Sequence, residues 1–340
     1  MKNVKLIRPW SVSLSSLLLY YIANFIPHSM LFIRLLRKLQ IDVVIVANLM
    51  PALWAFSLAP KKVLKVFAFQ DYFPESASAY YNSLPKIFRK LIESVAFFVN
   101  KLSLKMSNIT LCPCYSLINL SEKIGCKRNY FLPNGVDTNF FSPEKSDPKL
   151  REQLGLSEHT LVFYGLVESW LDFETLLSGI KILKKDFPNV KLLIIGSTLT
   201  NYNKVLEKML QDAKLTEDVI LTGYVPEELV PYYLNLGSLC LMPYRTDTFS
   251  GKIRLPLKFF IYSAMGKPIL SVPLLEVKKL NPRHVFFYSD AEDFAHKANM
   301  IFKNEKLRKE LEAYAKKFAK NFDYFNIAQE CEAILEKNRF

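Results

Sequence analysis

The sequence has 340 residues, of which half are apolar and 23% are charged, and its formal net charge is +13. This composition excludes an intrinsically disordered chain, and the length exceeds the usual size of one hydrophobic core, so we expect two domains. The positive charge indicates an anionic partner such as nucleic acid, an acidic membrane face or a phosphorylated substrate. The sequence has no Arg-rich block, zinc finger or RNA-recognition signature, so specific nucleic-acid binding is not expected.

The N-terminal stretch between Arg8 and Arg34 contains no Asp, Glu, Lys or Arg and resembles the apolar core of a signal or anchor. The same stretch also contains five serines, Asn24, Pro27 and His28. Two interpretations stay open: a strand at residues 5–7 followed by a mostly buried helix, and monotopic or inserted attachment to a membrane.

Four apolar, β-branched runs follow and predict strands at residues 42–48, 63–69, 108–114 and 129–134. Helical stretches fall between them, the strongest at residues 85–106. Strands that alternate with helices favour a parallel sheet with right-handed crossovers. Lysines and arginines in the 85–106 helix surround Phe97 and Phe98, so this segment is either a membrane-surface helix or a core helix of the sheet.

The five cysteines are odd in number and scattered in apolar runs, which is typical of a reduced cytosolic protein. Cys112 and Cys114 form a Cys-x-Cys pair, which alone is a weak metal signal, and a buried strand is the favoured interpretation. We therefore expect no metal at these cysteines, and we expect no cofactor.

A segment rich in proline and charge at residues 142–155 is typical of a linker with one turn of helix. After it the alternation of strands and helices restarts. The predicted strands are 160–165, 190–196, 218–223, 238–243, 268–272 and 284–289, and the predicted helices are 172–187, 203–214, 226–236, 256–265 and 291–303, with helix from 305 onward. The fold class is therefore α/β, with two tandem Rossmann-like domains that face each other across a cleft.

The segment from Arg254 to Ser271 predicts an anion site. Pro256 suits the start of a helix, Gly266 can end it in a left-handed conformation, and Lys258 lies in its first turn. Free N–H groups and the helix dipole favour negative charge at such a start. We interpret this helix, with Arg254 beside it, as a seat for the phosphates of a nucleotide.

Glycines end three strands of the second unit, at Gly165, Gly196 and Gly223. A glycine at a strand end permits a sharp turn or the close approach of a ligand. Because open parallel sheets bind ligands at the carboxyl ends of their strands, we expect Gly165 and Gly196 to border the site.

Several ordered motifs resemble those of the GT-B glycosyltransferases of family 4. "FLPNGVDTNFFSP" at 131–143 is similar to the domain junction of that family. "VKLLIIGS", "DVILTGYVPEELVPYYLNLGSLCLMPY" and "LPLKFFIYSAMGKPILSVPLLEV" follow in the order of its donor domain. The resemblance extends from about residue 131 to the C-terminus, and the first 130 residues match only in their strand–helix pattern.

The resemblance implies a nucleotide-sugar donor on the second domain, an acceptor on the first, retention of anomeric configuration and no obligatory metal. By this resemblance Lys258 contacts the diphosphate of the donor. Tyr224 and Val225 bind its base. Tyr244 and Arg245 face its sugar and phosphates. Trp170 is a secondary candidate to line the donor site.

Carboxylates at the acceptor side and beside Trp170 have two open interpretations each. Asp71 and Glu75 follow a predicted strand end and either orient or deprotonate an acceptor hydroxyl, or cap a helix. Asp172 is favoured as a helix N-cap, and its second interpretation is the Trp-x-Asp arrangement that a subset of the resembled family shows.

Three departures separate this sequence from the family pattern. The family carries one carboxylate on the Pro256 helix, which binds the donor ribose, and another before that helix. Here Ile261 and Ile253 replace them. The stretch 166–172 contains no cation where many members have Arg and Lys. The glycine-rich loop near the N-terminus is also missing.

The resulting prediction is a metal-independent, hexosyltransferase-like enzyme that moves a sugar from a nucleoside-diphosphate sugar to a glycan or lipid-linked acceptor. The alternative is a non-catalytic GT-B-like scaffold or partner-binding protein. We expect residues 1–140 to form the acceptor domain, 141–320 the donor domain, and 321–340 a helix that returns to the first. The expected location is the cytoplasm or, peripherally, the inner face of the cell membrane, with an anionic membrane surface as a further partner.

Overall fold

The computed structural model describes residues 5–7, 10–13, 17–47, 49–72, 74, 84–198, 200, 202–247 and 249–339. These residues form two compact units, and each is described here by itself. Unit 1 comprises residues 1–132 and 330–340, and unit 2 comprises residues 133–329. The division falls between Leu132 and Pro133, a few residues before the domain boundary predicted at 140.

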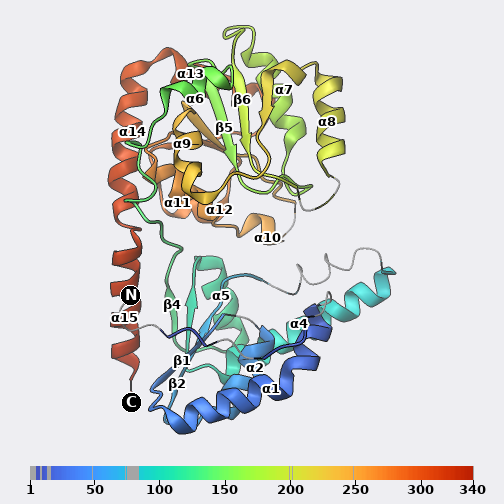
Figure 1. Ribbon diagram of the computed structural model, residues 1–340, viewed down its shortest axis with the longest axis vertical. Helices are drawn as coiled ribbons and strands as arrows, with labels where there is room; N and C mark the ends of the chain where they lie inside the picture. Colours follow the sequence, from blue (N-terminus) through green and yellow to red (C-terminus); the bar gives the residue numbers. More distant parts are fainter. Residues whose placement is uncertain are drawn as a thin grey trace. The chain divides into compact units, whose positions relative to one another are not determined.

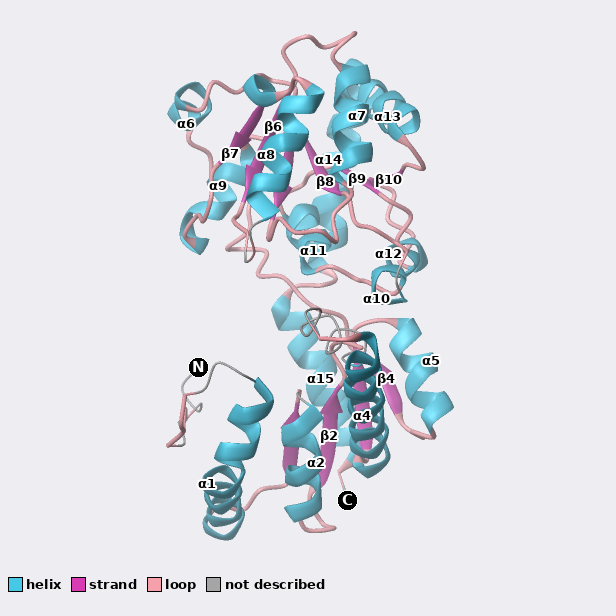
Figure 2. Cartoon of the chain, turned by 90° about the vertical axis from the view of Figure 1, so that its right-hand side faces the viewer, coloured by secondary structure: helices cyan, strands magenta, loops and turns pink. Residues whose placement is uncertain are grey.

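Unit 1 is built on a parallel sheet of four strands in the order β1-β2-β3-β4 (Figure 1). The strands are β1 (Val43–Val46), β2 (Leu64–Ala68), β3 (Ile109–Cys112) and β4 (Asn129–Phe131). The helices are α1 (Leu17–Lys38), α2 (Leu49–Leu58), α4 (Lys86–Met106) and α5 (Tyr115–Ile124). Each strand is added on the same side of the one before, so right-handed crossovers place α2, α4 and α5 on one face. Figure 2 shows α2 and α4 in front of the sheet, with α1 beside α2.

The two faces of β2 pack against different elements because successive side chains alternate across a strand. Phe67 contacts Phe56 of α2 with 6.5 Å between ring centroids. Leu64 and Val66 point the other way, into a core with Ile334 from the second half of α15 (Tyr324–Asn338). The C-terminal part of α15 thus completes the core of unit 1.

Unit 2 contains a second parallel sheet, of six strands in the order β10-β9-β8-β5-β6-β7. The strands are β5 (Thr160–Tyr164), β6 (Lys191–Ile195), β7 (Val219–Leu221), β8 (Leu239–Met242), β9 (Ile269–Ser271) and β10 (Val285–Phe287). The helices are α6 (Pro148–Gln153), α7 (Phe173–Leu183), α8 (Tyr202–Ala213), α9 (Val230–Asn235), α10 (Phe249–Lys252), α11 (Leu257–Ala264), α12 (Leu275–Lys279), α13 (Ala291–Lys303) and α14 (Glu305–Lys320). The central strands β5, β6 and β8 are buried throughout or nearly so, as expected of a sheet covered on both faces.

The predicted fold class, an α/β chain with two parallel sheets, is confirmed, and the strands of both sheets lie where the apolar runs predicted them. Whether the units face each other across a cleft stays a prediction.

The N-terminal segment and the C-terminal tail differ from the sequence-based expectation. Residues 5–7 form no strand and are exposed, and among the described side chains of α1 only Asn24 and Ser29 are buried. The tail is not one continuous helix, because Asp323 pairs with Val136 and its carboxylate accepts a hydrogen bond from Thr138 N at 3.1 Å before α15 begins.

Among the described residues, none of the helices combines the length and the apolar character that crossing a membrane requires.

Candidate functional site

The carboxyl ends of β5, β6 and β7 meet at three glycines of unit 2. Gly165 N donates a hydrogen bond to Ile195 O at 2.9 Å, and Gly196 forms a bridge with Gly223. Gly165 and Gly196 have φ of +127° and +149°, and a Cβ on Gly196 would lie 2.1 Å from Gly165 O. Only glycine permits this contact, so the strand ends carry bare backbone.

Lys258, in the first turn of α11, extends over Gly165. A Cβ on Gly165 would lie 2.9 Å from Lys258 Nζ. The same ammonium lies 3.8 Å from the ring centroid of Phe163 and 5.2 Å from that of Tyr244. Two aromatic faces therefore hold the cation at the strand end by cation–π attraction.

Arg254, just before α11, lies beside the same tyrosine, with Cζ 4.8 Å from the Tyr244 ring centroid. Burial, together with the positive charge of Arg254, holds the pKa of Lys258 well below its ordinary value. Within the described part of the chain, no carboxylate forms an ion pair with Lys258 or Arg254. Two neighbouring cations without a counter-ion favour a bound anion.

Two tyrosines hold this site in shape while remaining neutral. Burial raises the pKa of Tyr244 to about 12, although the charge of Arg254 opposes the shift. Burial likewise raises the pKa of Tyr262 well above its ordinary value. The Tyr262 hydroxyl accepts a hydrogen bond from Tyr164 N at 2.8 Å, which fixes α11 against the end of β5.

The loops after β5 and β8 pair through their backbones and bring two more predicted residues, Trp170 and Arg245, next to Tyr244. Arg245 N donates to Trp170 O at 2.8 Å, and Leu171 forms a bridge with Tyr244. The Arg245 guanidinium lies 3.7 Å from the Glu174 carboxylate, an exposed pair. Such a pair contributes little stability, so Arg245 is available to an anion.

Asp172 is confirmed as the N-cap of α7, because its carboxylate accepts hydrogen bonds from Thr175 N at 3.2 Å and Thr175 Oγ1 at 2.8 Å. The structural interpretation was therefore the correct one for this carboxylate.

Sequence reasoning missed Glu168, which lies in the stretch where the family pattern has cations. Its side chain is 3% exposed, and its carboxylate accepts hydrogen bonds from Thr200 N at 3.0 Å and Thr200 Oγ1 at 2.8 Å. The lack of cations at 166–172 was the available signal. The contact of the Phe163 ring with Lys258 was also missed, because Phe163 lies in a buried strand and its sequence context is that of an ordinary core residue.

Four candidates remain, and one of them lies outside the described residues. Tyr224 follows β7 and is 79% exposed, and Val225 beside it is half-buried. Asp71 follows β2 in unit 1 and is exposed. Glu75 lies outside the described residues.

The two isoleucines at the family's carboxylate positions are buried. Ile253 is 8% exposed and Ile261 is 5% exposed. These side chains therefore offer a ligand no hydrogen bond. The described residues also contain no group of three or more His, Cys, Asp or Glu that could hold a metal ion.

Comparison with known proteins places this geometry in context. The family model described as "Glycosyl transferases group 1" matches residues 146–318. The putative teichuronic acid biosynthesis glycosyltransferase TuaH of Bacillus subtilis (strain 168) is 26% identical over 213 residues, which are 62% of this chain and 51% of TuaH. The chain thus spans about half the length of this curated relative.

Solved structures share the fold of the whole chain. HepE of Anabaena, in a crystal structure with UDP and glucose, aligns with a TM-score of 0.70 and 15% identity over 96% of this chain and 84% of its own. Sucrose-phosphate synthase from Thermosynechococcus elongatus aligns with a TM-score of 0.73 and 14% identity over 97% of this chain and 82% of its own. At these identities the likeness shows the fold alone.

Proposed function

This chain belongs to the glycosyl transferases group 1 family, and we propose that it moves a sugar from a nucleoside-diphosphate sugar to a glycan or lipid-linked acceptor, with retention of anomeric configuration. The observation that carries the proposal is the pair of cations, Lys258 and Arg254, held without a counter-ion among the described residues at the strand-end glycines of unit 2. We propose UDP as the nucleotide, since HepE was crystallised with it.

In this reaction the bond between the anomeric carbon and the diphosphate oxygen breaks, and an acceptor hydroxyl forms the new bond to that carbon. The hydroxyl gives its proton to Asp71 or Glu75 where one of them acts as base, and otherwise to the departing diphosphate. The nucleoside diphosphate leaves with increased negative charge. Lys258 and Arg254 stabilise that developing charge, because cations already in place need no reorganisation during the reaction. This pair supplies the positive charge in our proposal, so the reaction proceeds without a metal.

The other predicted donor residues have supporting roles in this proposal. Gly165 and Gly196 leave the backbone open to the phosphates, and Arg245 and Tyr244 lie toward the sugar. Trp170 lines the donor site beside Arg245, and Tyr224 with Val225 contacts the base. Asp71 and Glu75 orient or deprotonate the acceptor hydroxyl.

The buried isoleucines favour a second candidate function, a non-catalytic GT-B-like scaffold or partner-binding protein. Ile253 and Ile261 replace both carboxylates that the family pattern carries near the donor. A protein that had lost turnover would tolerate these changes and still fold.

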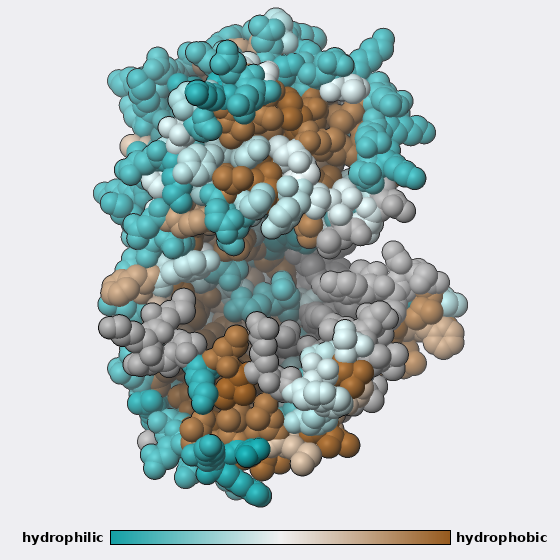
Figure 3. Space-filling view, in the orientation of Figure 1, coloured by the Kyte–Doolittle hydropathy of each residue, from teal (hydrophilic) through white to brown (hydrophobic). Residues whose placement is uncertain are grey.

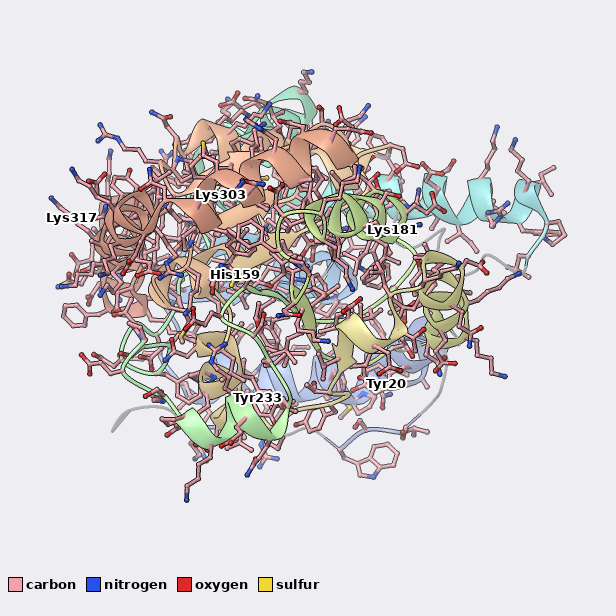
Figure 4. All side chains as sticks on the ribbon, turned by 90° about the horizontal axis from the view of Figure 1, so that it is seen from above. Tyr20, His159, Lys181, Tyr233, Lys303 and Lys317 are labelled. Atoms are coloured by element: carbon pink, nitrogen blue, oxygen red, sulfur yellow. The ribbon has the colours of Figure 1, made fainter. Side chains whose placement is uncertain are left out.

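Release of UDP from UDP-glucose and UDP-N-acetylglucosamine, with and without lipid-linked acceptors, tests the two candidates. We expect release, an unchanged rate on addition of EDTA, and a retained anomeric signal by proton NMR. Lys258→Ala should reduce kcat by about a hundredfold or more, the usual effect of losing one preorganised charge donor. Lys181→Ala, an exposed lysine on α7 (Figure 4), is the matched control. Saturable UDP binding without release from any UDP-sugar or GDP-sugar would instead favour the non-catalytic candidate.

A further inference from the structure

Among the described residues of unit 1, helix α4 is packed along one side. The packed side contains Ile92, Ala96 and Val99, which are half-buried, and Asn100 and Ser103, which are fully buried. This side contacts α2, and the N-terminal half of α4 extends beyond the neighbouring helices (Figure 1).

A second side of α4, next to the packed one, is apolar and faces solvent. Six residues at helical spacing form this side, here named the α4 stripe: Leu84 just before the helix, and Ile87, Phe88, Leu91, Val95 and Phe98 within it. Ile87 is 73% exposed and Phe98 is 59% exposed. In Figure 3 the projecting end of α4 shows brown, the colour of hydrophobic residues. A surface helix normally turns its apolar side to the core, so a contiguous exposed stripe marks an interaction surface.

The charge of the molecule is concentrated in the unit that carries this stripe. Unit 1 contains 19 lysines and arginines against 8 aspartates and glutamates, so +11 of the +13 net charge lies in its 143 residues. On α4, Lys86, Lys90 and Lys101 follow one flank of the stripe at helical spacing. In the described part of unit 1, these lysines form no ion pair.

Helix α1, which contacts α2 on its other side, repeats the pattern. Ile26 and Met30 on α1 are 67% and 66% exposed. A shallow hollow of about 610 Å³ begins at Met30 and is lined by Met30, Ile33, Arg34, Arg37 and Lys38. Its three cations, Arg34, Arg37 and Lys38, form no ion pair with any described residue. Apolar and cationic groups therefore adjoin on two helices of one layer.

We propose that unit 1 docks on the surface of an anionic lipid bilayer, with the α4 stripe in the boundary between headgroups and acyl chains and its flanking lysines on lipid phosphates. Helices with an apolar face and flanking lysines lie in this interface, and each lysine near an anionic leaflet adds about 1 kcal/mol. A second copy of this chain would bring the same positive charge to the contact, and nucleic acid offers no apolar phase for the stripe. This inference does not depend on the proposed glycosyl transfer.

Co-sedimentation of the full chain with vesicles tests the proposal. We expect binding to vesicles of equal parts phosphatidylglycerol and phosphatidylcholine, weak binding to phosphatidylcholine alone, and loss of binding in 0.5 M salt, where screening shortens to about 4 Å. The triple variant Ile87→Ser, Phe88→Ser, Leu91→Ser should bind the anionic vesicles at least about tenfold more weakly. The matched control carries Val205→Ser, Leu229→Ser and Met300→Ser, three exposed apolar residues of unit 2, and should bind as wild type.

A charge-changing pair separates electrostatic from hydrophobic binding. Lys86→Gln with Lys90→Gln should weaken binding by about fivefold per lysine, whereas Lys204→Gln with Lys208→Gln on α8 should not. UDP binding, whose proposed site lies in unit 2, and the circular dichroism spectrum show that each variant is folded.

Four outcomes would overturn the proposal. The first is equal binding to neutral and anionic vesicles, and the second is wild-type binding by the serine variant. The third is a dimer of the full chain that the serine variant dissociates, which makes a second copy the occupant. The fourth is displacement from vesicles by an RNA or DNA oligonucleotide, which makes nucleic acid the partner.

Discussion

At the residue scale, Lys258 is the residue on which the account depends most. Its ammonium lies between two aromatic rings and close to Arg254, and burial makes its charged form costly. The sequence could predict Lys258 and Arg254 because both adjoin a helix start with a proline. It could not predict their contacts with Phe163 and Tyr244, because an aromatic residue in a strand sequence does not indicate which side chains of other elements pack on its ring.

The pH dependence of nucleotide binding follows from the lowered pKa of Lys258. A diphosphate binds the protonated amine, so UDP affinity should be full below that pKa and fall as the pH rises through it, below the ordinary value near 10.5. In Lys258→Arg the guanidinium stays charged, and the alkaline fall should disappear. Calorimetric titrations at several pH values measure this, and a fall of equal size in Lys258→Arg would assign it to another group.

The buried isoleucines predict weak recognition of the ribose. Ile253 and Ile261 cannot accept a hydrogen bond, so removal of a ribose hydroxyl leaves no buried carboxylate unpaired at these two positions. We therefore expect UDP and 2′-deoxy-UDP to bind within about threefold of each other. A preference for UDP of about a hundredfold would show that another group of this chain reads the ribose.

At the element scale, the strand-end glycines determine how closely the loops after β5 and β6 approach. Gly196→Ala would place a Cβ 2.1 Å from Gly165 O at a φ of +149°. Strain and overpacking together should cost roughly 2–4 kcal/mol of unfolding free energy. Gly155→Ala is the matched control, because at φ +60° nothing lies within 4 Å of the added Cβ; about 1 kcal/mol is expected there. Urea denaturation compares the two, and equal losses would contradict the close-approach argument.

His284 joins α11 to α14 and makes their packing sensitive to acid. Its ring is fully buried against Phe259 and Phe318, and its Nε2 lies 2.8 Å from Ser263 Oγ. Burial lowers the pKa of His284 to about 3. The unfolded chain therefore binds a proton below about pH 6.5 that the folded chain excludes, and stability falls as the pH drops from about 6.5 toward 3.

Over that range the free energy of unfolding should fall by about 1.4 kcal/mol for each pH unit because of His284. His284→Leu should remove this part of the acid dependence, whereas His296→Leu, at an exposed position on α13, should leave it unchanged. Urea midpoints at pH 7 and pH 4.5 provide the measurement. The same slope in His284→Leu and wild type would rule out His284 as its source.

Elements were predictable where local pattern and tertiary packing agree. The buried strands β5 and β6 form continuous apolar runs that end in glycine, so local pattern alone located them. The helix from 305 onward was predicted without interruption because its composition is helical throughout. The break before α15 comes from the pairing of Asp323 with Val136, a partner far earlier in the chain that no local pattern reveals.

At the scale of the whole molecule, the net positive charge is divided unevenly between the two units, which the overall composition does not show. The total of +13 predicts an anionic partner, but the division into units places +11 of it in unit 1 and leaves +2 in unit 2. Unit 2 therefore relies on a few placed cations for its anion site, whereas unit 1 offers a broad positive surface. The sequence presented the 85–106 helix as either core or surface, and the exposed α4 stripe shows that its apolar side faces solvent.

The central claim is that unit 2 seats the diphosphate of a nucleotide at Lys258. Calorimetric titration of the full chain with UDP and GDP, in wild type, Lys258→Ala and Lys181→Ala, tests it most directly. We expect saturable binding of UDP that is at least about tenfold weaker in Lys258→Ala, because a charge-assisted contact is lost, and unchanged in Lys181→Ala. Equal affinity in all three proteins, or no binding of either nucleotide by a folded wild type, would contradict it.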